Sequence, residues 1–223
     1  NLFYIIMIKA LSFEKILPEE KQIENIVIFL HGYGANGNDL LGIGHHWKAQ
    51  LPNTLFISPN APFKTEWSQE SFQWFDLTSI APEKIGEGIY KAGPYLNKFV
   101  DEVISFYSVP CEKIIFVGFS QGTMMALNHL CKREKPCAGI IGYSGLLYEN
   151  EDFDNQIKSK FPINLFHGMA DEVINYNFSI KAFEKLKSLG FDVEHKLQKN
   201  LGHGIDEDGL TYGLKFIKKI FSI

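Results

Sequence analysis

A serine stands between two glycines in the stretch 114–122, which reads Ile-Ile-Phe-Val-Gly-Phe-Ser-Gln-Gly. The apolar, β-branched residues before Gly118 predict a strand, and the residues from Thr123 to Leu130 are compatible with a helix. Between a strand and a helix, a Gly-x-Ser-x-Gly turn holds the serine hydroxyl exposed at its tip, because glycines remove the Cβ atoms that would clash. Ser120 is therefore predicted to be a nucleophile for acyl transfer, and the chain must supply a base, an acid and an oxyanion site.

Histidine is the usual base for such a serine, and His203 is the best placed of the seven histidines. It follows a predicted strand, Val193 to Leu197, and lies between Gly202 and Gly204. The other histidines lie in His-Gly turns, on predicted helices or inside a strand, and are interpreted as structural or solvated: His31, His45, His46, His129, His167 and His195.

The acid that orients this histidine is predicted to be Asp171, which follows a predicted strand from Pro162 to Gly168. Other candidates come before the strand that they would have to follow: Asp152, Asp154 and Asp192. Ser120, Asp171 and His203 occur in the order nucleophile, acid, histidine. This is the chain order of α/β-hydrolases and not that of the other serine-hydrolase folds.

Predicted strands alternate with predicted helices along the chain, which indicates an α/β fold with a mostly parallel sheet and helices on both faces. We expect one domain over residues 1–223, without a separate lid domain. The other expected strands are Tyr4 to Phe13, Asn25 to Leu30, Thr54 to Ser58 and Ala138 to Tyr143. The other expected helices are Asp39 to Ala49, Gly88 to Tyr107, with its first turns kinked or shortened by Pro94, Asn177 to Leu189, and Glu207 to Phe221.

A glycine-rich turn, Gly32-x-Gly34-x-x-Gly37, follows the predicted strand Asn25 to Leu30. This spacing is the dinucleotide fingerprint, but that site needs a carboxylate at the end of the next strand to bind the ribose. No Asp or Glu is present there, in Pro59-Asn60-Ala61-Pro62. The same glycines would let a backbone N–H approach an ester oxygen, which is half of an oxyanion hole.

Five aromatic residues lie between positions 63 and 75 in a segment that follows neither a strand nor a helix period. Such a segment reads as a long loop over something apolar, and we expect it to form an acyl-binding wall beside the serine. The alternative is that its rings fill gaps in the core. The residues are Phe63, Trp67, Phe72, Trp74 and Phe75.

The net charge of −4, from 22 Lys and Arg against 26 Asp and Glu, comes without a basic run, so nucleic acid is not expected as a partner. The apolar start of the chain is too short to cross a bilayer and lacks the flanks of a signal peptide. Three cysteines without metal-site spacing are expected to be reduced thiols in a cytoplasmic protein. If the aromatic segment is exposed, it offers a contact for a homodimer.

Six short motifs together resemble the phospholipase/carboxylesterase family of α/β-hydrolases, which includes acyl-protein thioesterases and small bacterial carboxylesterases. The motifs are Leu30-His31-Gly32-Tyr33-Gly34, Pro59-Asn60-Ala61-Pro62, Trp74-Phe75-Asp76, Gly118-Phe119-Ser120-Gln121-Gly122, Gly168-Met169-Ala170-Asp171 and Gly202-His203-Gly204. The resemblance covers nearly the whole chain.

This resemblance implies a triad of Ser120, Asp171 and His203, with the backbone N–H groups of Tyr33 and Gln121 as the oxyanion hole. It implies esters, thioesters of acylated proteins or lysophospholipids as substrates, and neither a metal nor an organic cofactor. Tyr33 stands where much of the family has leucine, and its ring is expected to narrow the acyl entrance. Two other classes remain as alternatives: a dinucleotide-binding oxidoreductase that uses Gly32 to Gly37, and a hydrolase-like binding module without catalysis.

Overall fold

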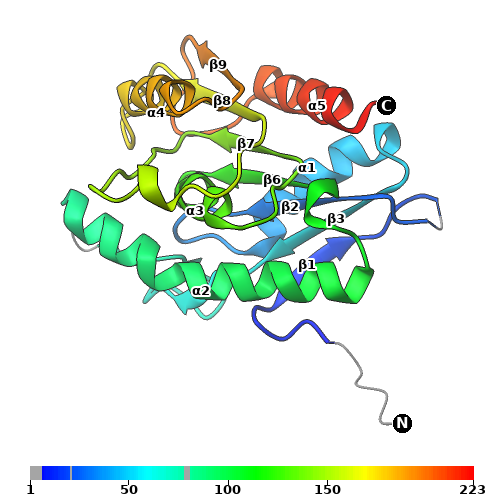
Figure 1. Cartoon of the computed structure of the whole chain (residues 1–223). Coiled ribbons are helices and arrows are strands. Elements are labelled where there is room, and N and C mark those ends of the chain that lie inside the picture. Colours follow the sequence, from blue (N-terminus) through cyan, green and yellow to red (C-terminus); the bar gives the residue numbers. More distant parts are fainter. Residues whose placement is uncertain (1–6, 21, 78–80) are drawn as a thin grey trace.

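The computed structural model describes residues 7–20, 22–77 and 81–223. Their main sheet has the strand order β1-β3-β2-β6-β7-β8-β9, in which β1 is antiparallel to β3 and the other neighbouring strands are parallel (Figure 1). Its strands are β1 (Phe13–Ile16), β2 (Asn25–Leu30), β3 (Thr54–Pro59), β6 (Ile114–Phe119), β7 (Gly139–Tyr143), β8 (Ile163–Gly168) and β9 (Val193–Gln198). Two short strands, β4 (Phe63–Lys64) and β5 (Phe72–Gln73), pair separately.

Helices cover both faces of the sheet, as the alternating pattern predicts (Figure 1). On one face lie α1 (Gly37–Trp47) and α5 (Glu207–Phe221), and on the other lie α2 (Pro82–Tyr107), α3 (Gln121–His129) and α4 (Asn177–Ser188). Short 3₁₀ turns span Lys48–Gln50, Cys111–Lys113, Leu130–Lys132 and Asp154–Gln156. The predicted fold class, a mostly parallel sheet between two layers of helices, is confirmed.

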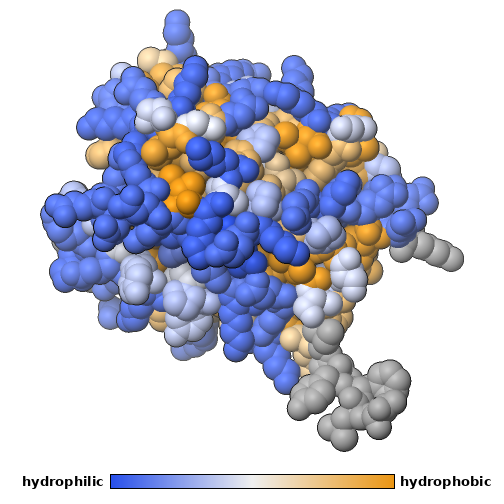
Figure 2. Space-filling view, viewed as in Figure 1, coloured by the Kyte–Doolittle hydropathy of each residue, from blue (hydrophilic) through white to orange (hydrophobic). Residues whose placement is uncertain are grey.

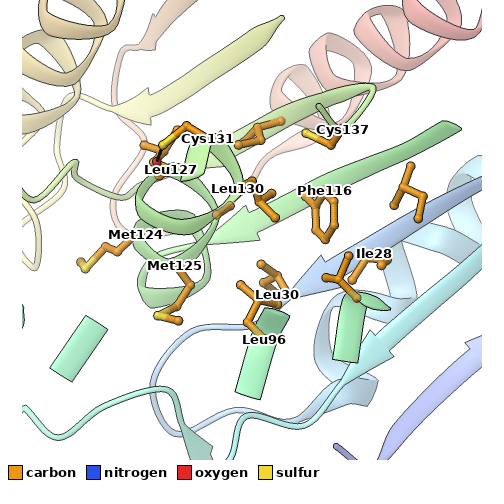
Figure 3. Close-up of a cluster of buried hydrophobic side chains, with 14 of the residues drawn as sticks. Ile28, Leu30, Leu96, Phe116, Met124, Met125, Leu127, Leu130, Cys131 and Cys137 are labelled. Atoms are coloured by element: carbon orange, nitrogen blue, oxygen red, sulfur yellow. Dashed lines mark hydrogen bonds between the residues drawn. The ribbon is translucent and has the colours of Figure 1, made fainter. Parts of the chain in front are cut away.

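The central strands are apolar on both sides because both sides are covered. Every residue of β2 is buried; Ile28 faces the cluster under α2 and α3, and Phe29 faces the cluster under α1 and α5. Figure 3 shows the first cluster, where Ile28 and Phe116 of the sheet face Leu96 of α2 and Met125 of α3. The core therefore fixes the sheet that carries the site.

The register of the parallel strands aligns their carboxyl ends along one edge of the sheet. The paired residues nearest this edge are Leu30 with Gly118, Phe119 with Tyr143, Tyr143 with Phe166, and Gly168 with Gln198. The segments that follow β2, β6, β8 and β9 consequently leave the sheet at one side, which is where open α/β sheets bind their ligands.

Two sequence predictions about elements are wrong. The strand expected from Tyr4 to Phe13 is instead β1, Phe13–Ile16; residues 1–6 lie outside the described residues, and 7–12 form no strand. The helix expected from Gly88 already begins at Pro82, which suits a first helical turn because that position needs no N–H donor. Pro94 lies on the exposed side of α2, beside a Tyr90 that is 81% exposed, so the unbonded carbonyl can reach water.

The outer surface of α2 is mostly hydrophilic, and Figure 2 shows polar side chains over much of this face, with several hydrophobic patches between them. Within the described ranges, no helix combines the length and the apolar character that crossing a bilayer requires.

His129, near the end of α3, is a buried histidine that holds α3 against α2. Its Nε2 lies 2.8 Å from the carbonyl oxygen of Ile89, and a Cβ added at Gly93 would lie 2.2 Å from its ring. Since a carbonyl only accepts, Nε2 donates this bond. Burial lowers the pKa of His129 to about 4, so the folded protein keeps this imidazole neutral under mildly acidic conditions.

Acidification from about pH 7 to about pH 5 is expected to reduce the free energy of unfolding by about 2 kcal/mol through His129 alone. The unfolded imidazole binds a proton near its ordinary pKa, whereas the folded one does not until about pH 4. His129→Gln keeps a donor for Ile89 and should lose this part of the pH dependence. Urea unfolding of both proteins at the two pH values measures the difference, and equal losses in both would contradict the prediction.

Candidate active site

Ser120 occupies a strained turn between β6 and α3. Its backbone, at φ 54° and ψ −116°, lies in a region that non-glycine residues rarely adopt. A Cβ added at Gly122 would lie 1.8 Å from the carbonyl oxygen of Leu30, and one added at Gly118 would lie 2.5 Å from the nitrogen of Thr123. Both glycines are therefore required by close backbone approach, and the turn has the geometry expected of a nucleophile elbow.

Asp171 and His203 meet at the carboxyl edge of the sheet. His203 Nδ1 lies 2.8 Å from Asp171 Oδ2, while Asp171 Oδ1 accepts hydrogen bonds from the N–H groups of Val173 and Ile174 at 2.9 and 2.8 Å. Because a carboxylate only accepts, His203 Nδ1 carries the proton and Nε2 presents its lone pair. The imidazole is thus held in the tautomer that a general base needs.

The Asp171 carboxyl group is charged at neutral pH even though its side chain has no exposed surface. Burial by itself raises the pKa of this group, but hydrogen bonds from the Ile174 N–H, from His203 and from the Val173 N–H outweigh it. The pKa of Asp171 consequently lies below its ordinary value.

A second imidazole contacts the same carboxylate. His167, the penultimate residue of β8, is fully buried, and its Nε2 lies 2.9 Å from the Ile174 carbonyl oxygen and 3.1 Å from Asp171 Oδ2. Both neighbours accept, so Nε2 donates to them. Burial lowers the pKa of His167, which keeps it neutral. His167 was interpreted from the sequence as a structural residue in a His-Gly turn, a pattern that does not reveal this contact.

Ser120 and His203 line one cavity of about 480 Å³. Its other lining residues come from the turn after β2, from α1, from the end of β6 and from two isolated positions: His31, Gly32, Tyr33, Gly34, Ala35, Asp39, Leu40, Phe119, Leu77 and Val173. The ring of Phe119 lies 4.9 Å from the His203 imidazole. Among the described residues, no hydrogen bond joins Ser120 Oγ to His203, and in unliganded enzymes such bonds are often long.

Of the two backbone donors predicted for the oxyanion hole, one belongs to a cavity-lining residue and the other to the residue after Ser120. Tyr33 lines the cavity directly, and Gln121 is the first residue of α3, whose N–H has no partner within the helix. Within the described part of the chain, neither of these two N–H groups makes a backbone hydrogen bond. Both are therefore free to donate to a substrate oxygen, and the N-terminal end of α3 favours negative charge there.

The aromatic segment is not where the acyl-wall prediction places it. Trp74 and Phe75 are buried in the core, and Phe63 lines a different hollow and packs against Tyr95. Phe72 lies in β5, and Trp67, which is 70% exposed, packs edge-on against the ring of Tyr33 at 5.0 Å. Among the described residues, the lining of the Ser120 cavity includes none of these five aromatic side chains.

The aromatic segment instead forms hydrogen bonds that hold the turn containing Tyr33 in place. The N–H of Gly34 donates to the Phe72 carbonyl oxygen at 2.9 Å, and the N–H of Phe72 donates to the Ala35 carbonyl oxygen at 2.8 Å. The Ser71 hydroxyl donates to the Gly34 carbonyl oxygen at 2.8 Å. The sequence could not show this role, because an aperiodic segment carries no signal for which loop it pairs with.

The same segment also holds the second donor, through the side chain of Gln121. Its Oε1 accepts a hydrogen bond from the N–H of Trp74 at 3.1 Å, and its Nε2 donates to the Phe75 carbonyl oxygen at 2.8 Å. The indole N–H of Trp74 donates to the His31 carbonyl oxygen at 3.0 Å. One segment therefore ties both proposed oxyanion donors to each other.

Gln121→Ala, which keeps the backbone donor, is expected to lower kcat by roughly 10- to 100-fold and to destabilise the fold by about 1–3 kcal/mol, because it strips the buried Trp74 N–H and Phe75 carbonyl of their partners. Kinetics on p-nitrophenyl butyrate and thermal unfolding measure the two effects. Asn128→Ala is the matched control, since this buried amide of α3 donates, among the residues that the structure describes, only to the Met124 carbonyl oxygen of its own helix. The prediction is wrong if both variants lose stability and neither loses activity.

His31 lines the Ser120 cavity, and its ring makes structural hydrogen bonds, in agreement with its interpretation from the sequence as structural or solvated. Its Nε2 accepts a hydrogen bond from the N–H of Ala61 at 3.0 Å, which leaves Nδ1 to donate to the Gly32 carbonyl oxygen at 2.7 Å. Burial lowers the pKa of His31 and keeps it neutral. The imidazole therefore links the start of the Tyr33 turn to the segment after β3. The sequence Pro59-Asn60-Ala61-Pro62 of that segment is one of the motifs that resemble the phospholipase/carboxylesterase family.

The glycine-rich turn does not leave an open phosphate site at the start of α1. The N–H of Gly37 donates to Asn60 Oδ1 at 2.8 Å, and that of Asn38 donates to Asn36 Oδ1 at 2.9 Å. These are the groups that would have to face a pyrophosphate in a dinucleotide site. Protein side chains occupy them, so the oxidoreductase alternative is not favoured.

Comparison with known proteins places these features in one family. The model of the phospholipase/carboxylesterase family matches residues 11–221. The chain belongs to this family. Acyl-protein thioesterase 1 of Candida albicans is 31% identical over 215 residues, which cover 87% of this chain and 91% of the relative. Acyl-protein thioesterase 1 homolog 1 of Dictyostelium discoideum is 27% identical, with 86% and 89% covered.

Solved structures of similar proteins share the fold. The crystal structure of esterase PE8 superposes with a TM-score of 0.91 and 33% identity, covering 94% of this chain and 99% of that one. The Bacillus cereus carboxylesterase, at 16% identity and a TM-score of 0.77 over 95% of each chain, supports the fold alone. The predicted α/β-hydrolase fold and the predicted class, an enzyme acting on ester bonds in the phospholipase/carboxylesterase family, are confirmed.

Proposed function

We propose that this chain hydrolyses carboxylic esters or thioesters with apolar acyl groups through an acyl-enzyme on Ser120. The observation that carries the proposal is the 2.8 Å contact of His203 Nδ1 with a charged, buried Asp171, at the cavity that also contains the strained Ser120. The named relatives, acyl-protein thioesterases and an esterase, support the same reaction class.

In the acylation step, Ser120 Oγ attacks the acyl carbon while His203 Nε2 takes its proton. Asp171 holds the imidazole in place and stabilises the imidazolium that forms. The N–H groups of Tyr33 and Gln121 receive the negative charge on the carbonyl oxygen, and each such donor typically contributes about 10²- to 10³-fold in rate. His203 then passes its proton to the leaving alkoxide or thiolate as the bond from carbon to the leaving group breaks.

In the deacylation step, a water molecule repeats the sequence on the acyl-enzyme. His203 removes a proton from the water, the resulting hydroxide attacks the acyl carbon, and the proton returns to Ser120 Oγ as the acid leaves. A thioester needs no additional group, because a thiolate is expelled more easily than an alkoxide. The side chains described suffice for both steps.

The acyl group is proposed to be apolar because of the residues that line the cavity beside Ser120. Leu77 and Val173 lie on this lining, and Val173 is 71% exposed, as an apolar side chain at a binding site often is. The proposed mechanism applies to the thioesters of acylated proteins and equally to the oxygen esters of lysophospholipids. The names of the thioesterase relatives favour the acylated proteins.

Hydrolysis of p-nitrophenyl esters with increasing acyl chain length tests this proposal. We expect octanoate to exceed acetate by at least about tenfold in kcat/KM, since each buried methylene contributes up to about 0.8 kcal/mol. A fluorophosphonate probe should label Ser120 stoichiometrically and stop turnover. A preference for acetate would refute the apolar acyl group, and a folded protein that neither takes the label nor cleaves any ester would refute the reaction.

The compartment and the oligomeric state of the enzyme are proposed from its cysteine residues and from one exposed aromatic residue. Cys111, Cys131 and Cys137 are free and buried, and burial raises their pKa values, which fits a reducing compartment such as the cytoplasm. The exposed Trp67 beside Tyr33 offers an apolar contact for a homodimer.

A further inference from the structure

A second hollow, of about 460 Å³, adjoins the Ser120 cavity at Phe119. Asp39, Leu40 and Phe119 line both spaces. The second hollow, called here the α1/α5 groove, is formed by Leu40 and Ile43 of α1, by Phe119, and by Ile205 and Leu210 at the start of α5. The two spaces are therefore neighbours, and a molecule bound at Ser120 that is long enough to pass over Phe119 reaches the α1/α5 groove.

The position of His203 indicates which part of the substrate lies nearer the α1/α5 groove. The imidazole that takes the proton from Ser120 must later give it to the leaving atom, so that atom lies against the imidazole. The Phe119 ring lies 4.9 Å from the imidazole, and Ile205 follows His203 by two residues. The next atoms of a leaving group consequently pass over Phe119 toward Ile205.

The Ser120 cavity and the α1/α5 groove have different apolar linings. Leu77 and Val173 line the cavity but not the groove, while Ile43, Ile205 and Leu210 line only the groove. An ester or thioester has two parts that meet at the acyl carbon, the acyl chain and the leaving group. Two separate apolar linings can bind these two parts.

We infer that the α1/α5 groove binds the leaving-group arm of the substrate, and that this arm is an uncharged alcohol or thiol with an extended apolar segment. This inference rests on the proposed function and adds a specificity-determining site to it. Its lining is mainly aliphatic and aromatic, which favours apolar groups. Asp39 and His46 are its polar lining residues, and the Asp39 carboxylate disfavours an anionic leaving group.

The experiment uses butanoyl thioesters of linear alkyl thiols from ethyl to hexyl, with release of the thiol followed by a disulfide reagent. These thiols differ little in basicity, so the chemistry is constant and only the length of the leaving arm changes. We expect kcat/KM to rise roughly two- to threefold per methylene. The rate of deacylation should not change, because every substrate forms the same butanoyl-enzyme.

Two charge-introducing variants separate the arms. Ile43→Glu places a carboxylate in the groove and should flatten the thiol series while the acyl series keeps its slope. Val173→Glu, at the other lining, should flatten the acyl series of p-nitrophenyl esters and leave the slope of the thiol series. If Ile43→Glu does not fold, Ile43→Ala should still reduce the slope of the thiol series by removing apolar contact.

Equal kcat/KM for the ethyl and hexyl thioesters would overturn the inference. It would also be overturned if Ile43→Glu flattened the acyl series instead, since the groove would then hold the acyl chain. Failure of the proposed function has a different signature, which is absence of both fluorophosphonate labelling and ester cleavage in the folded wild-type protein.

Discussion

Replacing Ser120 with alanine is expected to lower kcat/KM for p-nitrophenyl butyrate by roughly 10⁴- to 10⁶-fold. The substitution removes the only atom that would form the acyl-enzyme bond, and His203 and the oxyanion donors cannot replace it. The remaining activity would come from attack by water in the pre-organised site. Steady-state kinetics and the complete loss of fluorophosphonate labelling measure the effect.

Ser144→Ala is the matched control for this variant. Ser144 follows β7, next to Ser120 in the sheet, and its backbone is also left-handed, at φ 47°. Its buried hydroxyl has no hydrogen-bond partner among the described residues, so removing it costs no bond. We expect near-normal kinetics and labelling. Normal turnover in Ser120→Ala would show that another nucleophile does the chemistry.

Asp171→Asn is expected to lower kcat by about 10³- to 10⁴-fold with little change in the fold. The amide would offer an N–H where the carboxylate now accepts from His203 Nδ1, so the imidazole would favour the wrong tautomer and its protonated form would lose a stabilising charge. The pKa of Asp171 is lowered, so the wild-type carboxylate is charged throughout the neutral range and a deficit should be present at both about pH 6 and about pH 8.

The free energy of unfolding should also depend on the charge of Asp171, but at a lower pH than the neutral range of the kinetic experiment. A lowered pKa means that the ionised Asp171 stabilises the fold at neutral pH, and that this contribution disappears only as the pH falls through that lowered pKa. Asp206→Asn is the control, because Asp206 also accepts a backbone N–H, from Gly209 at 2.8 Å, but caps α5. Comparable kcat values for Asp171→Asn and Asp206→Asn would remove Asp171 from the mechanism.

Most of the sheet could be predicted because its strands carry strong local signals. The runs that became β2, β6 and β8 are mostly apolar and buried, and glycines lie at or just after the end of each run. The meeting of Asp171 with His203 followed from chain order and from the shared edge of parallel strands. The elbow at Ser120 followed from two glycines.

The parts that could not be predicted depend on pairings between distant residues. Nothing local distinguishes an aromatic ring that fills the core, as Trp74 does, from one that lines a pocket. The hydrogen bonds of Gln121 to the segment 74–75 join positions more than 40 residues apart, and composition does not record them. The contact of His167 with Asp171 was hidden for another reason, because a buried histidine in a His-Gly turn has many structural uses.

The fastening of the Tyr33 turn by the aromatic segment has an evolutionary consequence. Most of its hydrogen bonds to the turn use main-chain atoms, as between Gly34 and Phe72. Apart from Trp67, which packs against Tyr33, the side chains at 66–70 are exposed to solvent. Mutations at the other exposed positions can accumulate without disturbing the hydrogen bonds that hold the Tyr33 turn. In descendants of this enzyme, the exposed positions beside the Tyr33 turn can therefore diversify while the hydrogen bonds that hold the turn stay unchanged.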